Sequence, residues 1–230
     1  MNADEFFAAI QKGDKTQVES LLGSDPDLLQ VSDESGISPI LTAVYHQQPE
    51  IADLLAERTV LLTIFEAAAL GRIQHVIRLL AKDPELVNAY ADDGFQPLGL
   101  AAFFSQVEVA DYLLKAGAWV NSVSRNQMRV SPLNSAAAAG NTKIVDLLLK
   151  HGADPNIRQG GGFTPLHAAA QNGDTEMIKL LLFNGADLRS KTEEGKTALD
   201  LACEQGHDES INLLKEGITK RFRNSRKRCI

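Results

Sequence analysis

The stretch Phe163-Thr-Pro-Leu-His-Ala-Ala-Ala-Gln-Asn-Gly173 decides how this chain folds. One period earlier, Val130-Ser-Pro-Leu-Asn-Ser-Ala-Ala-Ala-Ala-Gly140 repeats the same order of residue types. A Thr or Ser that precedes a helix can accept hydrogen bonds from its unpaired amides, and Pro at the first helical position has no amide to leave unpaired. Each copy therefore predicts the start of a helix, followed by small residues that let a neighbouring helix approach closely.

A second helical pattern follows each copy, as in Ile144-Val-Asp-Leu-Leu-Leu149 and Met177-Ile-Lys-Leu-Leu-Leu182. Its paired leucines are suited to fill a core between neighbouring units. The Gly-Ala steps that begin at 117, 152 and 185 end this second helix, because glycine accepts the left-handed conformation there. The chain then enters a turn, for which we expect a hairpin-like finger.

The same pattern recurs along nearly the whole chain. Positions equivalent to the Thr of Thr-Pro-Leu-His are Asp4, Ser38, Leu62, Gln96, Ser131, Thr164 and Thr197. Their spacings are 34, 24, 34, 35, 33 and 33 residues. Five of these six intervals match a repeated unit of roughly 33 residues that contains a turn and two helices. The sequence resembles the ankyrin-repeat family over about residues 3–217, in seven units. This resemblance implies an all-α fold, a solenoid of about seven helix-turn-helix units with hairpin-like finger loops.

The second unit departs from the period. It is about ten residues shorter than the others, and Arg58-Thr-Val-Leu-Leu62 stands where a Gly-Ala-Asp and a finger would be. We expect a truncated loop at this junction and a bend in the stack.

Charge separates the chain into two parts. The net charge is -7, yet residues 215–230 contain seven basic residues and one acidic residue. We expect residues 1–218 to form the repeat domain and residues 219–230 to form a disordered basic tail. The tail could be a nuclear-import signal, a contact for anionic membranes or RNA, or only a solubilising end. An acidic body repels phosphates, so nucleic acid is expected as a partner only through the tail.

Composition and targeting signals narrow the function classes. The chain is 44% hydrophobic and 23% charged, as in an ordinary globular protein. No apolar run approaches the length that spans a bilayer, and the acidic N-terminus does not resemble a secretory signal. The two cysteines form no CxxC pair, which favours a reducing compartment. We expect a cytoplasmic monomer without integral membrane contact.

Patterns that carry catalysis or bind metals are missing from the sequence. There is no HExxH, no GxSxG and no P-loop in a strand-to-helix context. We therefore predict no catalytic residue, no metal, no cofactor and no small-molecule substrate. A hydrolase or transferase built on this fold is the alternative from another functional class, since fold alone does not exclude activity.

Two residues with reactive side chains are expected to have structural roles instead. In the family, the His of Thr-Pro-Leu-His, here His167, bonds to neighbouring hydroxyl and backbone groups. Cys203 aligns with Ala137 and Ala170, which predicts a small buried side chain.

The family resemblance also implies where a partner would bind, because ankyrin-like stacks hold proteins on a concave face formed by the first helices and the fingers. The pairs near the ends of the first helices are apolar or aromatic in the middle units. The first candidate partner-binding residues are Tyr45, His46, Leu70, Phe103 and Phe104. Exposed apolar groups often mark interaction sites. Alternatively, these residues pack on each other to compensate for the shortened second unit.

A finger in the fourth unit is the second candidate. Trp119 occupies the Asp position of Gly-Ala-Asp at the root of this finger, which continues through Arg125, Met128 and Arg129. Trp and Arg are enriched among interface hot spots. The alternative is a tryptophan that lies over the neighbouring finger and only covers apolar surface.

The sequence as a whole favours a non-catalytic protein-protein interaction module that binds another protein through its concave face and finger loops. The alternative function is a regulatory subunit or inhibitor that occludes an enzyme or a transcription factor. The acidic body favours a partner with basic patches around an apolar segment.

Overall fold

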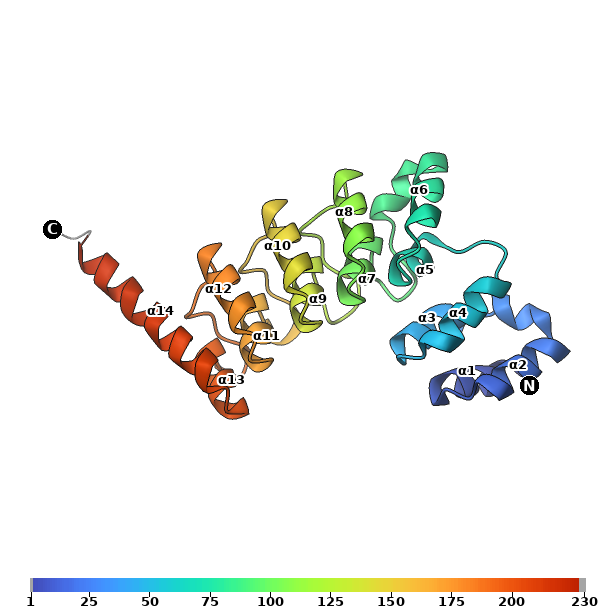
Figure 1. Cartoon of the computed structure of the whole chain (residues 1–230), viewed down its shortest axis with the longest axis horizontal. Coiled ribbons are helices and arrows are strands. Elements are labelled where there is room, and N and C mark those ends of the chain that lie inside the picture. Colours follow the sequence, from blue (N-terminus) through green and yellow to red (C-terminus); the bar gives the residue numbers. More distant parts are fainter. Residues whose placement is uncertain (1, 228–230) are drawn as a thin grey trace.

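The computed structural model describes the backbone of residues 2–227 and the side chains of residues 3–217. Its described part contains fourteen α-helices in seven consecutive pairs, which form two layers (Figure 1). The first helices of the pairs, here called inner helices, are α1 (Asn2–Lys12), α3 (Pro39–Tyr45), α5 (Ile64–Ala69), α7 (Pro97–Phe103), α9 (Pro132–Ala138), α11 (Pro165–Gln171) and α13 (Ala198–Gln205). The outer helices are α2 (Lys15–Ser24), α4 (Pro49–Arg58), α6 (Ile73–Lys82), α8 (Val107–Lys115), α10 (Thr142–Lys150), α12 (Thr175–Phe183) and α14 (Asp208–Lys227). Three short 3₁₀ helices lie in the connections: η1 (Pro26–Gln30), η2 (Pro84–Asn88) and η3 (Gly160–Gly162).

Side-chain caps begin several inner helices, as the repeat predicts. The Ser131 hydroxyl accepts the amide of Asn134 at 3.1 Å at the start of α9. Two starts differ from the prediction. Asp4 lies inside α1, which begins at Asn2, and Thr63 instead of Leu62 is the N-cap of α5. Its partner Glu66 accepts the Thr63 amide at 2.8 Å and completes a capping box. As a result α5 has six residues, whereas α3, α7 and α9 each have seven.

The turn between the two helices of each pair contains one residue with a positive φ. These residues are Gly13, Gln47, Gly71, Ser105, Gly140, Gly173 and Gly206. Glycine adopts this left-handed conformation without a steric penalty. Gln47, with φ of 55°, and Ser105, with φ of 61°, adopt it with a Cβ present. The second and fourth units therefore carry backbone strain that the other five avoid.

Asparagine side chains connect successive units outside the apolar core. The amide of Asn121 donates to the carbonyl of Gly152 at 3.1 Å, and its side-chain oxygen accepts the amide of Asp154 at 2.8 Å. Asn88 and Asn156 make the same pair of bonds to the units that follow them. These bonds set the register of one unit against the next.

The fingers are hairpin-like turns, and no residue of the described chain forms a β-strand. A backbone bond of 2.9 Å from the Ser124 amide to the Val130 carbonyl closes one finger. Neighbouring fingers are also joined, since the Gly160 amide donates to the Met128 carbonyl at 2.7 Å. The fingers thus form a continuous row beside the inner helices.

The second unit has no finger, and residues 59–63 connect α4 directly to α5. The first finger therefore lies against the third. A Cβ added to Gly36 would lie 2.6 Å from the Cβ of Asp92. The outer helices α4 and α6 pack on each other less than other successive outer helices do. Figure 1 shows α1–α4 turned relative to α5–α10, so the stack changes direction at the expected junction.

The C-terminal end differs from the sequence-based expectation in two respects. Helix α14 continues to Lys227, through most of the segment expected to be a disordered tail. No proline or glycine interrupts residues 219–227, and Lys and Arg are good helix formers. Residues 228–230 lie outside the described residues. Cys203 is exposed, unlike the aligned Ala137 and Ala170, because among the described residues no repeat unit packs on the far side of α13.

Candidate functional site

Aromatic side chains from two inner helices meet beside the shortened unit. The rings of Tyr45, at the end of α3, and Phe104, directly after α7, lie 5.6 Å apart. Phe103 packs edge-on against Phe104 at 5.1 Å. Leu70, directly after α5, lines a pocket of about 240 Å³ together with Phe104. We call Tyr45, Leu70, Phe103 and Phe104 the junction cluster.

Part of the junction cluster covers a small core of its own. Tyr45 and Phe104 pack on the buried side chains of Leu41, Ala69 and Leu100. Both rings are half-buried, so the packing alternative raised by the sequence describes them well. Phe103 is different, since 47% of its surface is exposed. His46 is also exposed and ends α3 as its C-cap.

Tyr45 is held by a carboxylate of the third finger. Its hydroxyl donates a hydrogen bond of 2.5 Å to Oδ2 of Asp93. The other oxygen of Asp93 accepts the amide of Phe95 at 3.1 Å. Burial, followed by this hydrogen bond and the negative charge of Asp93, raises the pKa of the Tyr45 phenol well above its usual value. The phenol is therefore a fixed neutral donor.

The candidate residues on the finger of the fourth unit have different surroundings. The guanidinium of Arg125 lies 3.8 Å from the ring centroid of Tyr90, a cation-π contact that fixes it on the third finger. Arg129 and Met128 are exposed, and Met128 retains 54% of its surface. Trp119 is 59% exposed at the root of the finger and lines neither of the two pockets formed by this finger's tip. Trp119 therefore does not share with Met128 the pocket that Met128 lines.

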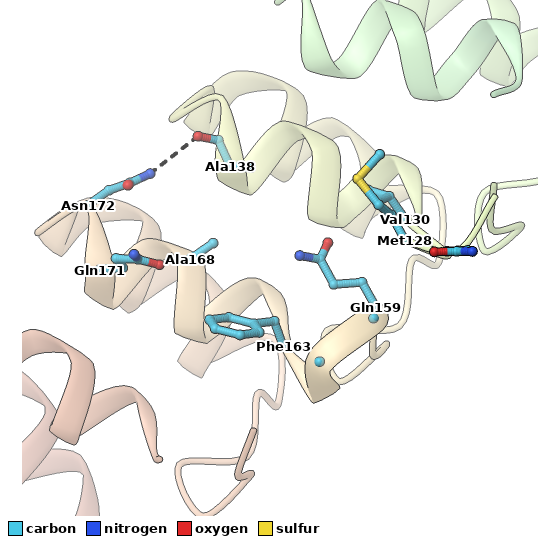
Figure 2. Close-up of a pocket in the computed structure, with 11 residues that line it drawn as sticks. Met128, Val130, Ala138, Gln159, Phe163, Ala168, Gln171 and Asn172 are labelled. Carbon is cyan, nitrogen blue, oxygen red and sulfur yellow. Dashed lines mark hydrogen bonds between the residues drawn. The ribbon is translucent and has the colours of Figure 1, made fainter. Parts of the chain in front are cut away.

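A pocket between the fifth and sixth units was not predicted by the sequence. It has a volume of about 640 Å³ and lies between α9, α11 and the adjoining fingers (Figure 2). Its apolar wall consists of Met128, Val130, Ala138, Phe163 and Ala168, and its polar rim consists of the amides Gln127, Gln159, Gln171 and Asn172. Ala138 occupies the position that Phe103 has in the preceding unit. Small residues between larger neighbours are the sequence signal that could have located this hollow.

The charge of the fingers changes sign along the row. The first and third fingers, residues 31–37 and 89–95, contain four acidic residues and no basic residue. Residues 123–130 and 157–163 contain three arginines and no acidic residue. The overall net charge of -7 does not reveal this separation. The first and third fingers form one continuous acidic surface only because they lie next to each other in the stack.

Exposed apolar side chains also occur away from the candidate residues. Val60 and Leu61 are exposed in the connection that replaces the second finger. Phe183, at the end of the outer helix α12, is 91% exposed. The sequence reasoning missed Phe183, although the equivalent positions of the two preceding units carry Lys115 and Lys150. Because lysine side chains are mostly exposed, these two lysines indicate that the position of Phe183 faces solvent.

The histidine of the repeat motif has the structural role that the resemblance implies. Nδ1 of His167 accepts the amide of Thr164 at 3.1 Å, and Nε2 lies 3.1 and 3.2 Å from the carbonyls of Ser190 and Lys196. Burial lowers the pKa of His167 although the two carbonyl contacts oppose this effect.

Within residues 2–227, no group of three His, Cys, Asp or Glu side chains is placed to hold a metal ion. No helix in this part of the chain is long and apolar enough to cross a membrane.

Comparison with known proteins gives the family. The model of ankyrin repeats in three copies matches residues 64–159 and 133–224. Ankyrin repeat and SAM domain-containing protein 6 of Rattus norvegicus is 35% identical over 101 residues, which are 44% of this chain and 11% of that protein. An ankyrin repeat protein of fowlpox virus is 32% identical over 171 residues, 68% of this chain and 37% of that protein. The nuclear factor NF-kappa-B p105 subunit of Gallus gallus is 47% identical over 66 residues, 29% of this chain and 6% of that protein.

These relatives are much longer than the matched stretches, which cover between 6% and 37% of their lengths. Ankyrin repeats are generally protein-protein interaction modules and are typically non-catalytic. The family model and the seven stacked helix pairs agree on the architecture. This chain belongs to the ankyrin-repeat family.

Proposed function

We propose that this chain binds another protein, without catalysing a reaction, through the surface formed by the ends of its inner helices and its fingers. The fold supplies this surface ready-made. Little conformational entropy would be lost on association, which favours binding by a rigid scaffold. The fingers and the inner helices contribute to the same hollows, as the pocket between α9 and α11 shows (Figure 2).

The exposure of Phe103 is the observation that carries this proposal. Its neighbour Phe104 packs on Tyr45 and on the small core beneath, whereas Phe103 leaves 47% of its surface in water. The edge-on contact of Phe103 with Phe104 covers only part of its side chain. Exposed aromatic groups next to well-packed apolar neighbours are typical anchors of protein interfaces.

The sharpest test compares two phenylalanines on different faces. Phe103→Ala removes the anchor on the inner helix α7, and Phe183→Ala removes an even more exposed ring on the outer helix α12. A partner would first be captured from native lysate by the wild-type chain, then purified, and its dissociation constant would be measured for each variant. We expect Phe103→Ala to weaken binding by about tenfold or more and Phe183→Ala to leave it unchanged.

Thermal unfolding of both variants controls for damage to the fold. Because neither ring is buried, both melting temperatures should stay close to that of the wild type. Equal binding by Phe103→Ala and the wild type would exclude the junction cluster as the contact surface. Weakened binding by Phe183→Ala alone would place the partner on the outer helices and contradict the proposal.

A further inference from the structure

The missing second finger creates a surface that a regular stack would not have. With no finger between them, the first and third fingers touch, and Gly36 of one lies against Asp92 of the other. The two tips together carry Asp33, Glu34, Asp92 and Asp93. Residues 31–37 and 89–95 contain four acidic residues and no basic residue, and one cation of the next finger, Arg125, stacks on Tyr90 beside them.

This acidic surface is continuous with the junction cluster. The hydrogen bond from Tyr45 to Asp93 joins the third finger to the rings at the ends of α3 and α7. From Tyr45, ring contacts lead to Phe104 and then to the exposed Phe103. An apolar anchor and a group of carboxylates are therefore presented side by side to one occupant.

Two of the four carboxylates are already used within the chain. Asp33 accepts the amides of Ser35 and Ile37 at 2.8 and 2.9 Å, and Asp93 accepts from Tyr45. Glu34 and Asp92 are exposed, and among the described residues neither has a hydrogen bond or an ion pair. These two side chains are free to meet an external cation.

We propose that the junction cluster and the two acidic fingers bind a segment of another protein in which a bulky apolar residue lies beside lysine or arginine. This inference rests on the proposed function and specifies the chemistry of the partner. Charge complementarity decides the occupant, because an acidic segment would be repelled and a neutral one would leave Glu34 and Asp92 unpaired. Arg129 and Arg158, on the two fingers farther along the row, repel a cation there, whereas the guanidinium of Arg125 is stacked on Tyr90. The basic residues of the segment therefore lie over Glu34 and Asp92 on the first and third fingers.

The test uses a display library of random dodecapeptides selected on the wild-type chain. Enriched peptides are synthesised, and their affinities are measured by fluorescence anisotropy for four variants. These variants are Glu34→Lys/Asp92→Lys, Glu34→Gln/Asp92→Asn, Phe103→Ala and the control Glu19→Lys/Glu108→Lys. Glu19 and Glu108 are exposed on the outer helices α2 and α8, and within the described residues they have no ion pair. The control therefore changes the net charge by the same amount on another face.

The expected peptides combine a large apolar residue with flanking Lys or Arg. Their binding should weaken about tenfold or more in Glu34→Lys/Asp92→Lys and less in the neutral variant, and it should weaken with added salt. The control should bind like the wild type. Thermal unfolding of each variant confirms that exposed substitutions leave the fold intact.

Several results would overturn the inference, and they separate it from the proposed function. Enrichment of acidic or uncharged peptides, or no enrichment, contradicts a basic partner. Peptides that depend on Phe103 but not on Glu34 and Asp92 would leave the proposed function standing and remove this inference. Peptides that depend on neither would contradict both.

Discussion

The hydroxyl of Tyr45 donates a 2.5 Å hydrogen bond to Asp93, a residue 48 positions away in the sequence. The bond spans the place where the second finger is missing and joins α3 to the third finger. It is accompanied by the ring contact between Tyr45 and Phe104. The shortened junction is thus stabilised by polar and apolar contacts that a regular unit would not need.

Removing this hydroxyl tests how much it stabilises the junction. Tyr45→Phe keeps the ring and deletes the donor to a partly buried carboxylate. We expect the free energy of unfolding to fall by about 1–3 kcal/mol, because a hydrogen bond to a charged group is lost. Urea unfolding measures the change. Tyr90→Phe is the matched control, since its hydroxyl makes only a 3.4 Å contact with the Val123 carbonyl. Equal losses in both variants would contradict a special role for Tyr45.

The two strained turns predict stabilising substitutions. Gln47→Gly and Ser105→Gly should each raise the free energy of unfolding by about 0.5–1 kcal/mol, since relief of the left-handed strain exceeds the entropy cost of glycine. Gly140→Ala is the reverse control at the same turn of the fifth unit. A Cβ there meets no atom within 4 Å, so the expected loss of about 1 kcal/mol arises from φ alone. Chemical denaturation of all three variants checks the sign, and a stabilised Gly140→Ala would refute the argument.

The stability of the chain should depend on pH through His167. Because burial lowers the pKa of this residue below 6.5 in the folded state, unfolding takes up a proton as the pH falls below that value. The contribution is therefore fully present above about pH 6.5 and is lost at lower pH. Denaturant midpoints measured between neutral and mildly acidic pH should decline more steeply for the wild type than for His167→Gln. Identical slopes would show that His167 does not titrate in this range.

A buried hydroxyl offers a fourth test. Thr42 on α3 is only 3% exposed, and its Oγ1 has no hydrogen-bond partner among the described residues. Thr42→Val preserves the shape and removes the unsatisfied group, so we expect a gain of about 1 kcal/mol in unfolding free energy. In Thr59→Val, by contrast, a hydroxyl that donates to the Leu55 carbonyl at 2.8 Å is lost. Calorimetric melting temperatures should move upward for the first variant and not for the second.

Local rules explain why the last four units could be predicted well. The Ser131 hydroxyl caps α9, Thr164 is the N-cap residue of α11, and Pro follows each of them at the first helical position. The same rules predicted less at the third unit, where Thr63 and Glu66 form the capping box one residue beyond the expected start. Alignment with the Thr of Thr-Pro-Leu-His placed the anchor at Leu62, but the side chain that satisfies the amides decides where the helix begins.

Exposure could be predicted only where neighbouring units are alike. Phe103 is exposed as expected from its position at the end of an inner helix. Cys203 is also exposed, although the equivalent residues of the two preceding units, Ala137 and Ala170, are buried. The reason is that burial in a stack depends on the next unit, and within the described residues no unit packs beyond α13 and α14. The pocket beside Ala138 was missed for a related reason, since a hollow results from the difference between adjacent units.

By itself, the sequence determined the family, the number of units and the helix boundaries in the regular part, because capping, glycine turns and apolar spacing act over a few residues. It also located the shortened unit. Only the tertiary structure decided what that shortening does. It brings Gly36 against Asp92, joins Tyr45 to Asp93 and leaves Phe103 exposed while Phe104 packs. These contacts depend on which units become neighbours when a finger is absent, and that adjacency is a property of the stack rather than of any single repeat.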